Sequence, residues 1–219
     1  MDEATANMAL VTTAVVTAVS SLLLAAVAIF GDSIRRKLYR PNLVLKLHSD
    51  IGSRINLTSR TGGQILMESR WFHIEVTNTA RSFPFHDVKV NLIEICGPSQ
   101  DGQFQSLWTG SVPTQWQHEP VSEKPFSSKT VGPACMADVC YIKENGDFGL
   151  NLVRTPNNVR ECLEKRILFA DRLKVKLVFQ AVSHEGDSSP LAISINWNKV
   201  WHSADSEFRN EISTSTETI

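Results

Sequence analysis

Cysteine and histidine are the residue types in this sequence best suited to metal or nucleophilic chemistry. Cys135 and Cys140 are separated by four residues, a spacing that one half of a structural zinc site can have. A complete site needs a second close pair of Cys or His, and neither Cys162 nor any of the six histidines forms one. We therefore interpret both cysteines as buried thiols on a strand and assign no metal site.

The usual sequence signatures of catalysis are missing. There is no Gly-x-Ser-x-Gly elbow, no Walker loop and no His-Glu-x-x-His helix. The run from His184 to Asp187 combines residue types found in active sites, but it lies between two strand-like runs and is typical of a hairpin turn. We interpret the chain as a binding protein rather than an enzyme, with no catalytic residue and no cofactor.

Lysine and arginine are concentrated in two parts of the chain. The formal net charge is -1, which excludes a uniformly basic nucleic-acid-binding protein but permits local basic surfaces. A first basic group follows the N-terminal apolar run and comprises Arg35, Arg36, Lys37, Arg40, Lys46, Arg54 and Arg60. A second group, mixed with acidic residues, comprises Arg154, Arg160, Lys165, Arg166, Arg172, Lys174 and Lys176. The first group faces either lipid headgroups or a phosphate-bearing ligand such as a nucleotide or oligonucleotide, and we favour the headgroups.

An uninterrupted apolar run from Met8 to Phe30 precedes these residues. It contains no Asp, Glu, Lys, Arg, Asn or Gln. About 20 such residues in a helix cross the hydrocarbon core of a bilayer, so we predict a single transmembrane helix. A cleaved signal peptide is the alternative, but the acidic start and the length of the run favour an uncleaved anchor.

The charges beside the apolar run predict its orientation. Asp2 and Glu3 precede it and four basic residues closely follow it, and positive flanks stay in the cytoplasm. We therefore predict a cell-membrane protein with its N-terminus outside and its C-terminal domain in the cytoplasm. In that compartment all four cysteines stay reduced.

Small and hydroxyl-bearing residues gather on one half of the predicted transmembrane helix at 100° per residue. They are Thr13, Ala14, Thr17, Ala18, Ser20, Ser21, Ala25 and Ala28. Val15, Val19 and most of the other large apolar residues lie on the opposite half. Small faces let helices approach closely, so we predict self-association into a homo-oligomer through this face.

Several runs in the remaining chain alternate apolar and polar residues with a period of two, as half-buried strands do. The clearest runs are 43–47, 72–76, 88–92, 175–179 and 192–197. We predict that one core contains Phe72, Ile74, Val76, Val88, Val90, Leu92, Val175, Leu177 and Phe179. Asn158 and Glu161 have the spacing of a helix capping box, which predicts one helix between strands.

The run from Trp71 to Val90, with its Val-Thr-Asn-Thr turn, resembles neighbouring strands of immunoglobulin-like β-sandwich domains. The predicted fold class is therefore mainly β, an immunoglobulin-like sandwich, with a small β-barrel as the alternative. The predicted organisation is a tail and transmembrane helix at 1–30, a basic linker at 31–41, the β domain at 42–202 and a mobile polar tail at 203–219.

Two functions fit this organisation. The layout is similar to membrane effectors of bacterial anti-phage defence systems, which implies a soluble module that answers to a nucleotide or oligonucleotide and controls a transmembrane pore. The alternative is a passive scaffold that recruits a protein partner to the membrane. Both hypotheses involve membrane lipids and self-association as partners.

Overall fold

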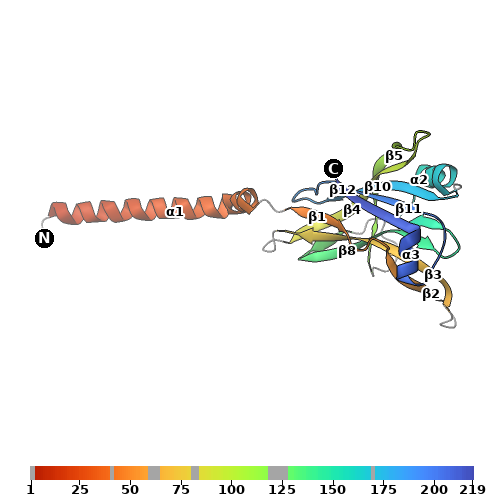
Figure 1. Cartoon of the computed structure of the whole chain (residues 1–219). Coiled ribbons are helices and arrows are strands. Elements are labelled where there is room, and N and C mark those ends of the chain that lie inside the picture. Colours follow the sequence, from red (N-terminus) through yellow and green to blue (C-terminus); the bar gives the residue numbers. More distant parts are fainter. Residues whose placement is uncertain (1–2, 40–41, 59–64, 80–83, 118–127, 169–170) are drawn as a thin grey trace. The chain divides into compact units, whose positions relative to one another are not determined.

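The computed structural model describes residues 3–39, 42–58, 65–79, 84–117, 128–168 and 171–219 (Figure 1). The chain divides into two compact units, Met1–Pro41 and Asn42–Ile219. The first consists of one helix, and we call the second the β domain.

Helix α1 runs from Glu3 to Tyr39 and has 37 residues. Ala and Leu are frequent in it and Pro does not occur, which favours an unbroken helix. Gly31 lies inside the helix, so the predicted linker at 31–41 is helical as far as Tyr39. The described part of the helix ends at Tyr39. Among the described residues, no helix combines the length and the apolar character of a membrane span.

The β domain consists mainly of two antiparallel sheets, which confirms the predicted mainly β class. The first sheet contains β1 (Leu43–Leu47), β2 (Ser53–Thr58), β3 (Ile65–Asn78), β6 (Gln115–Trp116), β8 (Ala134–Lys143) and β9 (Phe148–Leu150). Its main strand order is β1-β3-β8-β6, with β2 paired to β3 and β9 paired to β8.

The second sheet contains the last three strands of the chain and three earlier strands. It contains β4 (Phe85–Pro98), β5 (Phe104–Pro113), β7 (Lys129–Val131), β10 (Leu173–Val182), β11 (Leu191–Trp197) and β12 (Ile212–Thr218). Its main strand order is β12-β11-β10-β4-β5, with β7 paired to β4. The sequential strands β3 and β4 thus belong to different sheets.

The hydrophobic core lies between the two sheets. All nine residues predicted to share one core are at most 1% exposed and belong to a single apolar cluster, which confirms that prediction. Alternation explains it, since every second side chain of a strand points to the same face.

One helical segment links β9 to β10, where a helix was predicted. It consists of α2 (Asn157–Leu163) followed by the π-helical turn η1 (Glu164–Leu168). The predicted capping box is wrong, because the N-cap residue is Pro156 and no side chain caps the helix. Asn158 instead accepts a hydrogen bond from the Val159 backbone N–H at 2.9 Å.

The C-terminal segment is ordered, so the predicted mobile tail at 203–219 is wrong. Residues Asp205–Glu211 form helix α3, and β12 pairs with all seven residues of β11. Phe208 and Ile212 are buried and fasten the segment to the core. The polar composition of β12 reflects its place at the edge of a sheet, where side chains stay in water.

Candidate functional site

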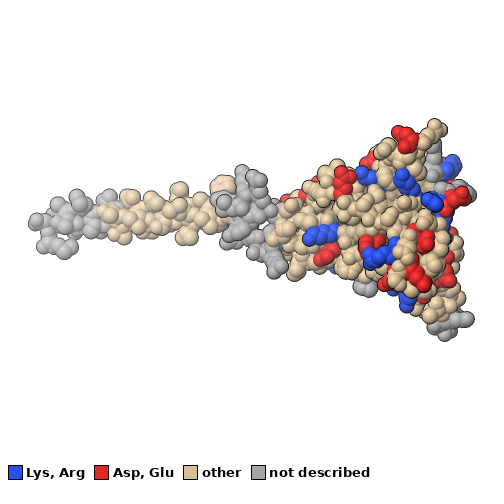
Figure 2. All heavy atoms as spheres, viewed as in Figure 1, with Lys and Arg blue, Asp and Glu red and all other residues tan. Residues whose placement is uncertain are grey.

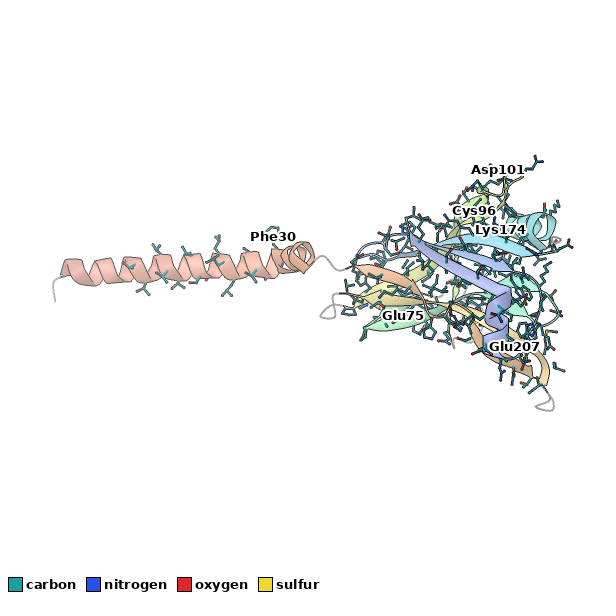
Figure 3. All side chains as sticks on the ribbon, in the orientation of Figure 1. Phe30, Glu75, Cys96, Asp101, Lys174 and Glu207 are labelled. Carbon is teal, nitrogen blue, oxygen red and sulfur yellow. The ribbon has the colours of Figure 1, made fainter. Side chains whose placement is uncertain are left out.

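The predicted association face of α1 lies on a helix whose apolar side chains are exposed. The large apolar residues from Val15 to Phe30 with described side chains are each more than half exposed. Figure 2 shows this part of the helix free of Lys, Arg, Asp and Glu, and in Figure 3 the side chains, Phe30 among them, project outward. Such a surface needs a covering of lipid or protein.

Two hydroxyl groups of this face form hydrogen bonds within the helix. Thr17 Oγ1 donates to the Thr13 carbonyl at 2.8 Å, and Ser21 Oγ donates to the Thr17 carbonyl at 2.9 Å. Back-bonding to the residue four positions earlier satisfies a hydroxyl without water or a second helix. The two protons are therefore already used, although both oxygens can still accept a bond.

The first basic group is not brought together in the described structure. Lys46 is exposed on β1 opposite Glu75, and Arg54 on β2 donates to the Ser203 carbonyl at 2.8 Å. Three others lie on the last turns of α1, with side chains outside the described residues: Arg35, Arg36 and Lys37. Arg40 and Arg60 also lie outside the described residues.

Several side chains of the second basic group have partners inside the domain. Lys165 pairs with Glu161 at 3.1 Å, and Lys176 pairs with Glu217 at 3.4 Å. Lys174 donates to the Gly102 carbonyl at 2.7 Å (Figure 3). Intramolecular partners of this kind compete with a phosphate for the same ammonium groups.

A buried arginine organises the contact between the β2–β3 hairpin and the C-terminal segment. Arg70 is 0% exposed, and its Nη2 lies 2.8 Å from Asp205 Oδ1. Its guanidinium carbon lies 4.2 Å from the centre of the Phe208 ring and 5.8 Å from that of Trp201. The aromatic faces stabilise a cation that has left water. We call these residues, together with Arg54, Glu68 and Ser203, the arginine cluster.

Glu68 completes the arginine cluster on its polar side. Its Oε2 accepts hydrogen bonds from Ser203 Oγ at 2.6 Å and from Trp201 Nε1 at 3.4 Å. The bond from Ser203 lowers the pKa of the Glu68 carboxyl below its ordinary value. These contacts hold the C-terminal segment against the first sheet, so we assign Glu68 a structural role.

Sequence analysis missed Arg70, although a signal was present. Arg70 is in phase with Phe72, Ile74 and Val76, so the alternation that places these residues in the core also turns Arg70 inward. A charged residue at an inward position needs a partner supplied by the fold. The partner, Asp205, lies in the segment predicted to be mobile.

A second polar pair lies on the first sheet. His73 is 2% exposed, and its Nδ1 lies 2.7 Å from Asp138 Oδ1. Its Nε2 has no hydrogen-bond partner among the described atoms. A carboxylate orients an imidazole in this way in nucleophilic sites, but no described hydroxyl or thiol bonds to Nε2.

Two of the four cysteines, Cys96 and Cys140, lie in environments that disfavour the thiolate. Burial raises the pKa of Cys96 to about 11, and burial also raises the pKa of Cys140. Cys135 and Cys140 both lie on β8, as expected of strand thiols, although Cys135 is only half-buried. Within the described residues, no three side chains of His, Cys, Asp or Glu are placed to share a metal ion.

One groove of about 420 Å³ lies between β5 and α2. Its lining includes Gln105, Leu107, Asn158 and the ion-paired Glu161 and Lys165. Because the two opposite charges neutralise each other, the groove has no strong preference for an anion or a cation.

The chain matches no protein-family model, no curated protein and no solved structure.

Proposed function

We propose that the protein is a membrane-anchored interaction module. In this proposal α1 inserts into the bilayer and self-associates, and the β domain binds a protein partner. The exposed apolar surface of α1 is the observation that carries it, because water cannot cover so many large aliphatic side chains without a substantial free-energy cost.

The proposed span is residues 8–30, which contain no charged side chain. The structure describes side chains over a shorter run, 12–28. The whole span of 8–30 exceeds the roughly 20 residues that cross a bilayer. The basic residues from Arg35 to Arg40 follow the span, which favours a cytoplasmic β domain.

The strand order supports an immunoglobulin-like fold for the β domain. Immunoglobulin sheets have the strand orders A-B-E-D and G-F-C, and some add a strand C′ beside C. The order β1-β3-β8-β6 corresponds to A-B-E-D, and β11-β10-β4-β5 corresponds to G-F-C-C′. On this assignment β12 is an extra strand beside G. The fold by itself implies no particular activity.

A protein partner fits the β domain better than a nucleotide or oligonucleotide does. Arg54, Lys165, Lys174 and Lys176 each have a partner within the domain. A phosphate ligand would have to break these contacts and offset their loss. Figure 2 shows blue and red side chains interspersed over the visible face of the domain, with no broad single-sign surface.

A pore-forming effector is the second candidate, because hydroxyl groups gather on one face of α1. The internal hydrogen bonds of Thr17 and Ser21 favour the anchor over the pore, since hydroxyls satisfied within the helix need no wet lumen. The helix itself is common to both candidates.

Membrane insertion is tested by adding charge to the proposed span. Val19→Lys and Leu23→Lys together should raise the free energy of insertion by about 5 to 7 kcal/mol and move the full chain out of the carbonate-resistant membrane fraction. Val200→Lys, at an exposed apolar position of the β domain, is the control and should stay in that fraction. The proposal fails if the unsubstituted chain is extracted by carbonate, or if the double variant resists extraction equally.

A further inference from the structure

Strand β2 lies at an edge of the first sheet as the described strands form it. Among the described strands it pairs only with β3, so the backbone donors and acceptors along its other side meet no strand. Such an edge is a template for another extended chain, and proteins usually protect it with charges, prolines or bulges.

The β2–β3 hairpin also carries most of the exposed apolar side chains of the domain. Five large apolar residues are exposed in the described part of the domain, and three belong to this hairpin: Ile55, Ile65 and Leu66. Leu57 and Met67 lie opposite each other on the face that carries Ile55, and both are half-buried. Figure 1 shows the hairpin at one end of the domain.

The one described charge on β2 does not protect its edge. Arg54 turns toward the C-terminal segment and donates to the Ser203 carbonyl at 2.8 Å. The other polar edge strand, β12, differs because its exposed side chains are Ser, Thr and Glu. The β2–β3 pairing has one irregularity, between Leu57 and Thr58, at the end of the strand, and the run from Ser53 to Leu57 pairs regularly.

We propose that β2 pairs with β2 of a second copy, antiparallel about a two-fold axis at Asn56. This register places Ile55 opposite the partner copy's Leu57, so apolar side chains meet on one face at two symmetric positions. It places Arg54 opposite Thr58, so like charges do not oppose each other. A two-fold interface requires this self-complementarity. The pairing involves only the β domain and does not depend on α1.

Disulfide trapping of the full chain tests this register. Asn56→Cys places the two new Cα atoms about 4.5 to 5.5 Å apart in an antiparallel pair, within the range that a disulfide bridges. Mild oxidation with copper phenanthroline should therefore yield a disulfide-linked dimer. Ser53→Cys is the matched control, because its two copies would lie about 20 Å apart at a rise of about 3.4 Å per residue. The unsubstituted chain reports any crosslinking through its four native cysteines.

A second variant tests the apolar contact itself. Ile55→Lys in the Asn56→Cys chain should lower dimer yield about tenfold, because both symmetric Ile55–Leu57 contacts are lost. Ile55 is 38% exposed, so a Lys side chain there can extend into water and the domain should still fold, which a cooperative thermal transition reports. The measurement applies whether the chain is recovered from membranes or from solution, so it is independent of membrane anchoring.

Three results would overturn the proposal. One is a monomer at Asn56→Cys after oxidation, and another is equal crosslinking at Ser53→Cys or with Ile55→Lys, which would indicate random collision. The third is a crosslink from Cys at position 56 to a species of different mass, which would show that a foreign chain covers the edge.

Discussion

Helix α1 and the β domain contain the same types of aliphatic residue but differ in how far they bury them. Val15 and Val19 of α1 are 56% and 54% exposed, whereas Val76 and Val88 of the β domain are 0% exposed. The β domain buries an apolar core between its two sheets. The helix satisfies its own backbone but leaves its side chains uncovered. The β domain thus covers its apolar core with its own strands, while the exposed apolar side chains of α1 need lipid or protein to cover them.

The largest expected effect comes from truncating a core aromatic residue. Phe72→Ala should lower the free energy of unfolding of the β domain by about 3 to 5 kcal/mol, because it removes a fully buried ring from between the sheets. Urea unfolding of the full chain in mild detergent, followed by tryptophan fluorescence, measures this. All five tryptophans lie in the β domain, so the signal reports on that unit alone.

Leu23→Ala in α1 is the control for this comparison. Leu23 is 62% exposed, so its truncation should change the unfolding of the β domain by less than about 0.5 kcal/mol. A large effect of Leu23→Ala would mean that α1 packs on the domain, and the contrast between the two units would be lost.

Sequence periodicity predicted the core well because alternation is a local property. The run 43–47 coincides with β1 and the run 175–179 with the middle of β10, and the residues that the period selects point inward. Periodicity did not identify β12, because its Ser and Thr residues have no apolar alternation to detect. Its strand is specified by pairing with β11, which is a long-range property.

The arginine cluster gives an intermediate effect. Asp205→Ala removes the ion partner of a guanidinium that cannot return to water, so it should destabilise the domain by about 1.5 to 3 kcal/mol. Denaturant unfolding measures the loss. Although Asp205 itself is 68% exposed, the cost arises at the buried Arg70.

Glu207→Ala is the matched control for Asp205→Ala. Both acidic residues lie in the first turn of α3, so they favour its N-terminus equally, and their exposures are similar. Glu207 is paired only with the partly exposed His202 at 3.4 Å, so its loss should cost less than about 1 kcal/mol. Equal costs for the two variants would mean that the buried guanidinium does not need Asp205.

The candidate sites were harder to predict than the core. The density of Lys and Arg in the sequence does not reveal which of these side chains have partners in the fold. Arg54, for example, donates a hydrogen bond to the Ser203 carbonyl, 149 positions away. His73 lies between the inward residues Phe72 and Ile74, so alternation turns it away from the core, yet it is buried beside Asp138. Pairing between distant strands decides such burial, and composition carries no information about it.

The smallest expected effect concerns the two faces of α1. Ala18→Leu with Ser21→Leu should weaken self-association several-fold, because larger side chains keep two helices apart at the small face. Val15→Leu with Val19→Leu, on the opposite face, should leave association unchanged. Energy transfer between labelled full chains in vesicles measures both. Ser21 donates within its own helix, so removing its hydroxyl does not by itself break a contact between helices, and any loss reports on packing.

The same variants distinguish the two functions. If expression harms the host and the harm falls only with the small-face pair, the pore-forming effector gains support. If the chain is harmless while association still falls, the anchored interaction module is the better account. If both pairs leave association unchanged, the small face does not join the copies, and contacts between β domains must be sufficient to hold them together.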